Sequence, residues 1–417
     1  MVYSMINPRV LVLSSQPFNY LTGFGITASN LFKGWPVGRI ACAYMQDIDP
    51  ARDVCDKHYR VWKAGKASVG SKDHALGSIK RKFISMGFGN LVSFPVSREF
   101  KSWLIDFSPD ILFCVPDSLP QIIFALKTAK ISGAKVAVYM LDDWPERFKS
   151  ANPVKRTFLS IVFNHYFMRL LRMSDLRLAI GSEMCNAYRR RYGLEFMPFQ
   201  NCPDHELWTK FSGTEKVKGD PFRFVFTGAI YNPGNLQTLL RFSKALEIIN
   251  NNGFNARLEI YVCADRIFGY KEIFSAYEHT VLFELVTEQD KIAMLYSGCD
   301  GLLLVLGFGK IDSLGEKYSM PTKLPAYMLS GTAILGIVPE DCALSRFILN
   351  NATGVLISKT DSIPELAQAI VEFCRGDALR KRVSLQAGLI AKERFSAEKV
   401  RIKFAKTITS VLERAYS

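Results

Sequence analysis

Residues 318–335 are the stretch of this sequence whose residue types most clearly suggest chemistry. Pro321 and Thr322 suit the start of a helix, because proline lacks the amide hydrogen that a first helical turn leaves unpaired. Apolar residues follow at helical spacing, and Gly331 suits the helix end. A loop that feeds a helix N-terminus can bind an anion, and Lys323 adds a positive charge there. An ordinary helix-to-strand unit is the alternative interpretation of the same residues.

Two adjacent carboxylates, Asp142 and Asp143, follow the apolar run 135–141. The carboxyl ends of parallel strands are where ligands gather in doubly wound sheets, so this pair could orient an acceptor hydroxyl or accept its proton. The alternative is a helix cap, which an aspartate before Trp144 and Pro145 also explains.

Two glycines occupy the turn that follows another apolar run. Gly23 and Gly25 come after the run 9–15. Glycine lets a backbone approach a ligand closely, although a plain strand-to-helix turn accounts for the same residues.

Metal and disulfide chemistry are not expected. Asp47 and Asp49 form a D-x-D pattern, but no other residues support a metal clamp around it. The nine cysteines are scattered without a C-x-x-C pair, which favours free thiols in a reducing cytoplasm. No apolar run reaches the length of a membrane span, and the first residues lack the layout of a signal peptide.

The chain has 417 residues and a net charge of +14 that is unevenly spread. Residues 1–210 hold 28 Lys and Arg against 17 Asp and Glu, whereas residues 211–417 hold 25 against 22. The first half therefore faces an anionic partner, for which nucleic acid, acidic lipid or a diphosphate are candidates. Residues 71–95 mix cations with apolar residues at helical spacing, which suits either an anionic membrane face or a solvated helix edge. Without an aromatic and basic platform, nucleic acid is not expected.

Apolar runs alternate with helical patterns through the whole chain, which predicts an α/β protein with parallel sheets and helices on both faces. The length favours two domains. We predict domains at 1–205 and 206–395, joined by a link over 201–218, and an amphipathic C-terminal helix within 396–417. Strands are expected at these positions: 9–15, 39–45, 110–116, 135–141, 177–182, 222–228, 256–263, 280–286, 301–307, 332–338 and 354–358.

Several of these segments together resemble one enzyme family. P-T-K-L-P-A-Y-M-L-S-G-T-A-I-L from Pro321, K-V-A-V-Y-M-L-D-D-W-P from Lys135 and N-C-P-D from Asn201 are similar to motifs of the retaining glycosyltransferases of family 4. The segments from Leu11 to Gly25 and from Ser174 to Met184 resemble further segments of that family, in the same order. The resemblance implies the GT-B architecture, in which two Rossmann-like domains face each other across a cleft, and a final helix that crosses back to the first domain.

The resemblance also implies a function. The chain is expected to be a hexosyltransferase-like, metal-independent enzyme that moves a sugar from a nucleotide-diphosphate sugar to a lipid-linked or polysaccharide acceptor, with retention. The resemblance implies a role in cell-surface glycan biosynthesis. It also implies a cytoplasmic protein, peripheral at the inner face of the cell membrane, that needs no cofactor. Catalytic roles are expected for Asp142, Asp143 and Lys323. The expected donor-binding residues are Gly23, Gly25, Gly228, Ala229, Tyr231, Asn232, Arg266, Tyr318, Pro321, Thr322 and Lys323.

Three departures from the family pattern leave a second function open. The glutamate that contacts the nucleotide ribose falls on Ala326, and its acidic partner falls on Tyr318, with Glu316 nearby. The Arg and Lys expected after Gly228 are absent, and Leu141 or Asp142 replaces the histidine of the first domain. A catalytically silent protein of the same fold, acting as a binding or regulatory subunit, is therefore the alternative.

Overall fold

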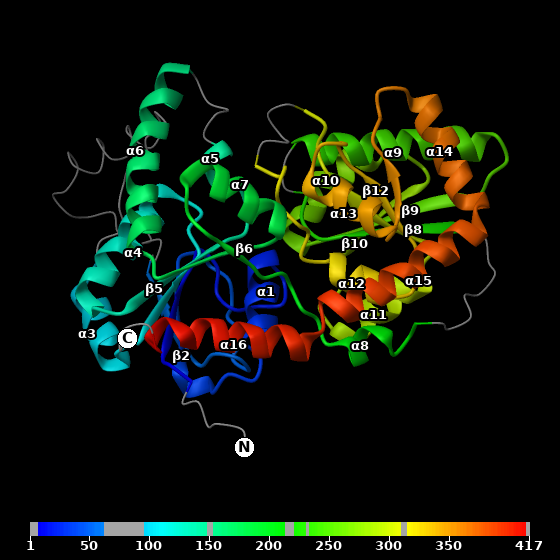
Figure 1. Ribbon diagram of the computed structural model, residues 1–417. Coiled ribbons are helices and arrows are strands. Elements are labelled where there is room, and N and C mark those ends of the chain that lie inside the picture. Colours follow the sequence, from blue (N-terminus) through cyan, green and yellow to red (C-terminus); the bar gives the residue numbers. More distant parts are fainter. Residues whose placement is uncertain are drawn as a thin grey trace, which may run out of the picture. The chain divides into compact units, whose positions relative to one another are not determined.

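A computed structural model describes residues 7–61, 96–147, 153–212, 221–230, 233–309 and 315–413, with the side chains of 153–159 left out. The chain divides into two compact units (Figure 1). The first unit comprises residues 1–199 and 401–417, and the second comprises residues 200–400. The basic amphipathic segment 71–95 lies outside the described residues.

The first unit is built on a seven-stranded parallel sheet in the order β3-β2-β1-β4-β5-β6-β7. Its described strands are β1 (Val10–Leu13), β2 (Ile40–Tyr44), β3 (Lys57–Arg60), β4 (Ile111–Cys114), β5 (Lys135–Met140), β6 (Leu176–Ala179) and β7 (Met197–Pro198). The helices are α1 (Gly23–Phe32), α3 (Arg98–Phe107), α4 (Leu119–Ser132), α5 (Trp144–Arg147), α6 (Pro153–Met173), α7 (Ser182–Tyr192) and α16 (Ala397–Glu413).

The second unit contains a six-stranded parallel sheet in the order β10-β9-β8-β11-β12-β13. Its strands are β8 (Phe222–Thr227), β9 (Ala256–Val262), β10 (Thr280–Glu284), β11 (Gly301–Val305), β12 (Ile334–Ile337) and β13 (Val355–Ile357). Its helices are α8 (His205–Thr209), α9 (Pro233–Asn251), α10 (Ala264–Phe274), α11 (Gln289–Gly298), α12 (Leu324–Leu329), α13 (Ala343–Asn351), α14 (Ile363–Arg375) and α15 (Asp377–Arg394).

Both sheets bury apolar runs between layers of helices, so the predicted α/β class with two parallel sheets is confirmed. In the second unit α9 packs beside α14, and α12 packs beside α15 on the other side of the sheet (Figure 1). β1, β2, β4 and β11 are buried at every residue, as expected of central parallel strands covered on both faces.

The final helix belongs to the core of the first unit. Phe404 of α16 is fully buried. Its ring centroid lies 5.0 Å from that of Phe32, 5.9 Å from Phe113 and 5.4 Å from Phe199. Arg401 also donates to the Asn30 carbonyl at 2.7 Å. Edge-to-face aromatic contacts therefore fasten α16 to α1 and β4.

The structure differs from the sequence prediction in four places. β3 and β7 were not expected, because β3 is a polar edge strand, K-H-Y-R, and β7 has only two residues. The segment 201–218, expected to be a link, contains α8. The helix expected to start at Pro321 begins at Leu324 and has six residues, because residues 322 and 323 form a turn.

Each sheet has a switch point, where the chain returns to the centre after building one side. In the first unit this point lies between β1 and β4, and in the second between β8 and β11. Loops diverge there at the carboxyl ends of the strands, and the resulting crevice is the usual ligand site of open α/β sheets.

Candidate functional site

Gly228 and Lys323 lie together beside the switch point of the second unit. Gly228 follows β8 with φ of +107°, a conformation that favours glycine. A Cβ built on Gly228 would lie 4.0 Å from the Nζ atom of Lys323. The Lys323 amine donates a hydrogen bond to the Thr227 carbonyl at 2.7 Å. Two residues that the sequence places 95 positions apart thus share one small region.

The Lys323 amine is enclosed mainly by aromatic groups. It lies 3.9 Å from the ring centroid of Phe226 and 5.7 Å from that of Tyr327. In the described part of the chain it forms no salt bridge with an acidic side chain. The residue as a whole is partly exposed, but burial of its amine lowers the pKa of Lys323 to about 7.

Thr322 is held by a residue distant in sequence. The Asn201 side-chain amide donates to the Thr322 carbonyl at 2.8 Å, and Asn201 is itself buried. Pro321, Thr322 and Tyr318 are all half-buried. The turn before α12 is therefore held at two residues: Asn201 binds the Thr322 carbonyl, and the Lys323 side chain binds the Thr227 carbonyl.

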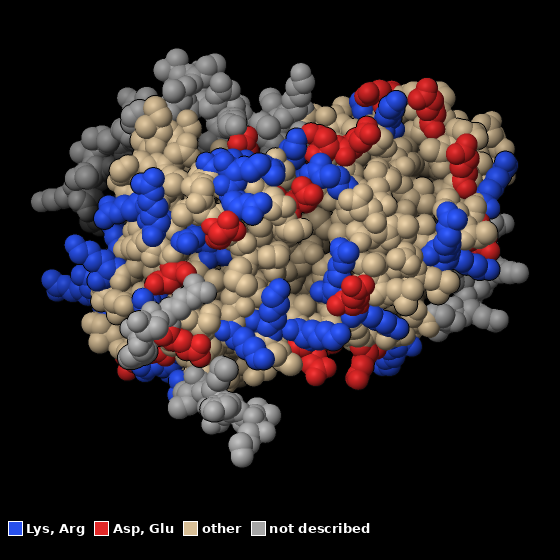
Figure 2. All heavy atoms as spheres, viewed as in Figure 1, with Lys and Arg blue, Asp and Glu red and all other residues tan. Residues whose placement is uncertain are grey.

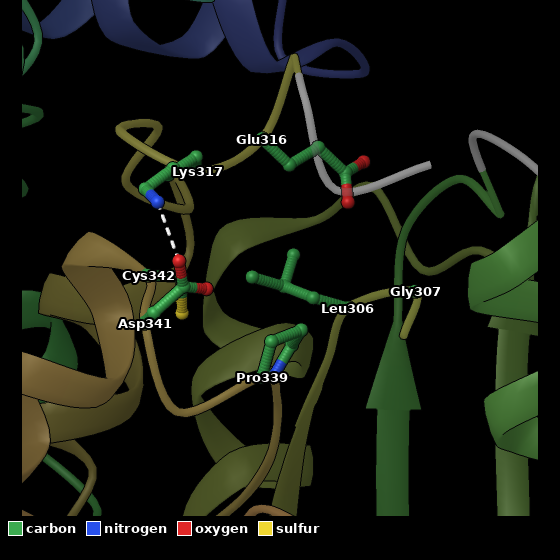
Figure 3. Close-up of a pocket in the computed structure, with 7 residues that line it drawn as sticks. All are labelled: Leu306, Gly307, Glu316, Lys317, Pro339, Asp341 and Cys342. Atoms are coloured by element: carbon green, nitrogen blue, oxygen red, sulfur yellow. Dashed lines mark hydrogen bonds and ion pairs between the residues drawn. The ribbon is translucent and has the colours of Figure 1, made fainter. Parts of the chain in front are cut away.

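A small pocket opens beside this turn, at the carboxyl ends of β11 and β12 (Figure 3). Its lining residues come from the loops after these two strands and from the segment before α12: Leu306, Gly307, Glu316, Lys317, Pro339, Asp341 and Cys342. Lys317 pairs with Asp341 across it. Lys317 is thus already engaged by a carboxylate, unlike Lys323.

The remaining donor-binding candidates of the second unit are exposed or lie outside the described residues. Arg266 on α10 is 71% exposed and pairs with Asp265 at 3.5 Å. Ala229 is exposed, and Tyr231 and Asn232 lie outside the described residues. Ala326, at the place of the family's glutamate, is buried in α12.

The two aspartates of the first unit have different surroundings. Asp142 is half-buried at the end of β5, and the Tyr188 hydroxyl donates to its carbonyl at 3.5 Å. The Asp143 side chain is fully buried, and its two oxygens accept from Arg191 at 2.7 and 2.9 Å. Burial raises the pKa of the Asp143 carboxyl, and the Arg191 guanidinium opposes that rise.

Arg191 belongs to a basic helix end, since the last turn of α7 also carries Arg189 and Arg190. Arg191 contacts Glu146 at 3.4 Å as well as Asp143. Figure 2 shows Lys and Arg side chains gathered over the part of the first unit where α5 and α7 lie, with acidic side chains among them. Part of the basic charge of this unit is thus neutralised locally.

Asp117 is a candidate that the sequence interpretation did not include. It lies in the loop between β4 and α4, at the switch point of the first unit. Burial raises its pKa, hydrogen bonds to Ser15 and Ser118 oppose the rise, and the charge of Asp142 adds to it. The signal was available, because Asp117 follows the apolar strand by the same logic that selected Asp142.

Gly25 has a packing reason for being glycine. A Cβ there would meet the Asn19 side chain at 2.3–2.5 Å. The Asn19 side-chain oxygen Oδ1 accepts from the backbone N–H groups of Leu21 and Thr22, and the Thr22 hydroxyl caps α1 by accepting from the Gly25 N–H. Gly23 is the first residue of α1. The loop after β1 is therefore a compact, capped turn.

Among the described residues, no group of three His, Cys, Asp or Glu side chains could hold a metal ion. Asp47 pairs with Arg60 at 2.5 Å. All nine cysteines are free. No helix in the described ranges is long and apolar enough to cross a membrane.

Comparison with solved structures defines the class of fold. No family model matches the sequence, and no curated protein is similar to it. The structure, however, matches GT-B proteins over nearly its full length, which identifies the fold as GT-B.

Three of these structures illustrate the match. Sucrose-phosphate synthase from Thermosynechococcus elongatus has a TM-score of 0.65 at 12% identity, over 97% of this chain and 100% of that one. HepE from Anabaena, in complex with UDP-glucose, has a TM-score of 0.64 at 11% identity, over 96% and 99%. A glycosyltransferase from Rickettsia africae has a TM-score of 0.62 at 11% identity, over 97% and 99%.

Proposed function

We propose that this chain is a glycosyltransferase that uses a nucleotide-diphosphate sugar as donor. The observation that carries the proposal is the Lys323 amine, which adjoins Gly228 at the switch point of the second sheet and lacks an acidic partner in the described residues. A diphosphate is a suitable ligand for such an amine, because its negative charge is opposite to that of the protonated amine. HepE, of the same fold, was solved with UDP-glucose.

The reaction requires that the acceptor hydroxyl forms a bond to the anomeric carbon while the bond from that carbon to the diphosphate oxygen breaks. The hydroxyl proton leaves with a base, and the negative charge stays on the nucleotide diphosphate. The backbone amides of Thr322 and Lys323, together with the Lys323 amine, would stabilise that charge. Stabilisation of the diphosphate charge by these groups requires no metal ion.

The finer features of the proposal rest on the family resemblance. We infer a retaining mechanism, family 4 membership and a hexose donor. We infer a lipid-linked or polysaccharide acceptor in cell-surface glycan synthesis, reached from the cytoplasm at the inner face of the membrane. The excess of Lys and Arg in residues 1–210 supports an anionic membrane surface as a partner.

A thermal-shift panel of UDP-, ADP- and GDP-sugars tests the donor, because a ligand that binds the native state raises the melting temperature. Release of nucleoside diphosphate, measured with and without candidate glycan acceptors, then tests transfer. Binding with release that depends on an acceptor confirms a transferase. Binding without release under any acceptor would instead favour the silent subunit, and no binding at all would contradict the donor site.

A further inference from the structure

Thr227 sits where the ladder between β8 and β11 stops. These strands pair at Phe224 with Gly301 and at Val225 with Leu302, and the described register continues no further toward Thr227. On its other side, β8 stays paired with β9 as far as Thr227. The backbone of Thr227 therefore needs other partners on the β11 side.

Two side chains of one helical turn supply those partners. The Thr227 N–H donates to the Tyr327 hydroxyl at 3.3 Å, and the Thr227 carbonyl accepts from the Lys323 amine at 2.7 Å. Lys323 and Tyr327 are four residues apart, and the Tyr327 N–H donates to the Lys323 carbonyl at 2.9 Å, so both project from the first turn of α12. These two side chains take the place of strand β11 as hydrogen-bond partners of Thr227, the residue just before Gly228.

Tyr327 is well placed to hold this arrangement. It is fully buried, and its hydroxyl lies 3.1 Å from the Thr227 hydroxyl, which lies 2.7 Å from the hydroxyl of Tyr296. The rings of Tyr296 and Tyr327 pack edge to face with centroids 4.7 Å apart. Each group in this buried cluster has a defined hydrogen-bond partner, which makes the position of Thr227 rigid.

We propose that Tyr327 is a positioning residue for the donor diphosphate: its hydroxyl, bound to the Thr227 backbone, holds the Gly228 turn at the correct distance from the Lys323 amine. The inference rests on the proposed function, since it assigns a role within the same donor site. It adds a residue that neither the sequence motifs nor the chemistry of the site selects, because a buried tyrosine on an apolar helix face is ordinarily a core residue.

Tyr327→Phe and Tyr296→Phe form a matched pair. Each substitution removes one hydroxyl that hydrogen-bonds to Thr227 Oγ1. Only Tyr327→Phe also removes the acceptor of the Thr227 N–H. The measurements are the melting temperature of each variant and the dissociation constants of UDP-, ADP- and GDP-glucose, tested in turn by calorimetry. Thr227→Val is a third variant, which loses both hydroxyl contacts and keeps the backbone bond.

We expect Tyr327→Phe to weaken binding of the donor about tenfold, the loss of one well-aligned contact to a charged ligand. Tyr296→Phe and Thr227→Val should stay within about twofold of the wild type while losing comparable melting temperature. Equal weakening in all three variants, or none in Tyr327→Phe, would overturn the positioning role. If the wild type binds none of the three sugars, the proposed function itself fails.

A measurement on the wild type guards against a variant that does not fold. Amide hydrogen exchange should find the Thr227 N–H protected in the ligand-free protein, because the Tyr327 hydroxyl accepts from it. Exchange at the rate of an open loop would contradict the bond on which the inference depends.

Discussion

Asp143 and Arg191 form a two-point ion pair, with oxygen-to-nitrogen distances of 2.7 and 2.9 Å, between the end of β5 and the last turn of α7. Asp143 has no exposed side-chain surface, whereas Arg191 keeps 27% of its own. The pair joins two elements that are 48 residues apart. One of the two adjacent aspartates is thereby committed to a structural contact, and Asp142 is left as the more accessible carboxylate.

The first prediction separates the two aspartates. Asp143→Asn should lower the free energy of unfolding by about 2 kcal/mol, because it leaves the partly buried Arg191 without its main counter-ion. Asp142→Asn should leave stability within about 0.5 kcal/mol and lower turnover more than donor binding. Urea unfolding and steady-state kinetics check both. A stable Asp143→Asn with lost turnover would instead identify Asp143 as the reacting carboxylate.

The second prediction concerns Lys323. Lys323→Ala should lower nucleotide-sugar affinity or turnover at least about tenfold, the scale of one lost charge-assisted contact. Lys317→Ala is the matched control, because that amine is already paired with Asp341. It should change affinity less than about twofold. Similar losses in the two variants would show a general effect of positive charge.

The third prediction is a pH dependence of donor binding. Burial lowers the pKa of Lys323 from 10.5 to about 7, so the empty site loses its positive charge as pH rises through 7. A bound diphosphate favours the protonated amine, hence donor affinity should weaken above pH 7 by up to about tenfold per pH unit. UDP-glucose is a suitable probe because its diphosphate does not titrate near 7. Lys323→Met should abolish the dependence, and a wild-type affinity that stays constant from pH 6 to 9 would contradict it.

The same pKa shift has a consequence for the ligand-free protein. Between pH 7 and 10.5 the unfolded chain binds more protons at Lys323 than the native state does. The free energy of unfolding should therefore gain a contribution from this residue as pH rises through that window. Comparing wild type with Lys323→Met by urea unfolding at pH 6.5 and 9.5 checks the sign, because the variant lacks the contribution.

The fourth prediction concerns the final helix. Phe404→Ala should cost about 3 to 4 kcal/mol of stability, because it empties a buried site among three aromatic rings. Ile402→Ala on the same helix is the control, since Ile402 is 50% exposed and its loss should cost less than about 0.5 kcal/mol. Equal melting temperatures for the two variants would show that α16 is not part of the core.

The fifth prediction tests whether Gly25 is needed for packing. Gly25→Ala should lower the melting temperature, because its Cβ would overlap the Asn19 side chain, which organises the turn before α1. Gly38→Ala is the control, since nothing lies within 4 Å of a Cβ there. If the melting temperature is unchanged and donor binding is lost, the glycine serves the ligand instead.

The sequence alone was sufficient for the α/β class and for the central strands. The strands β1, β2, β4 and β11 are apolar runs bounded by turn residues, and burial on both faces requires that pattern. Strand β3 escaped prediction because one side of an edge strand meets solvent, so polar residues suit it, and β7 escaped prediction because it has only two residues. The short helix α12 began later than expected, because Lys323 and Thr322 are held in a turn by contacts from Thr227 and Asn201.

For the candidate site, residue types and spacing selected Lys323 and the aspartate pair, and the family resemblance added Gly228, but neither showed what each of them contacts. Only the tertiary structure showed that Lys323 and Tyr327 bind Thr227 and that Asp143 pairs with Arg191. It also showed that Asp117 lies close enough to Asp142 for the charge of Asp142 to raise the Asp117 pKa. The physical reason is that periodicity reports which face of an element is buried, a property local to that element. Hydrogen bonds between residues about a hundred positions apart depend on how sheets and helices pack, and no local pattern records that.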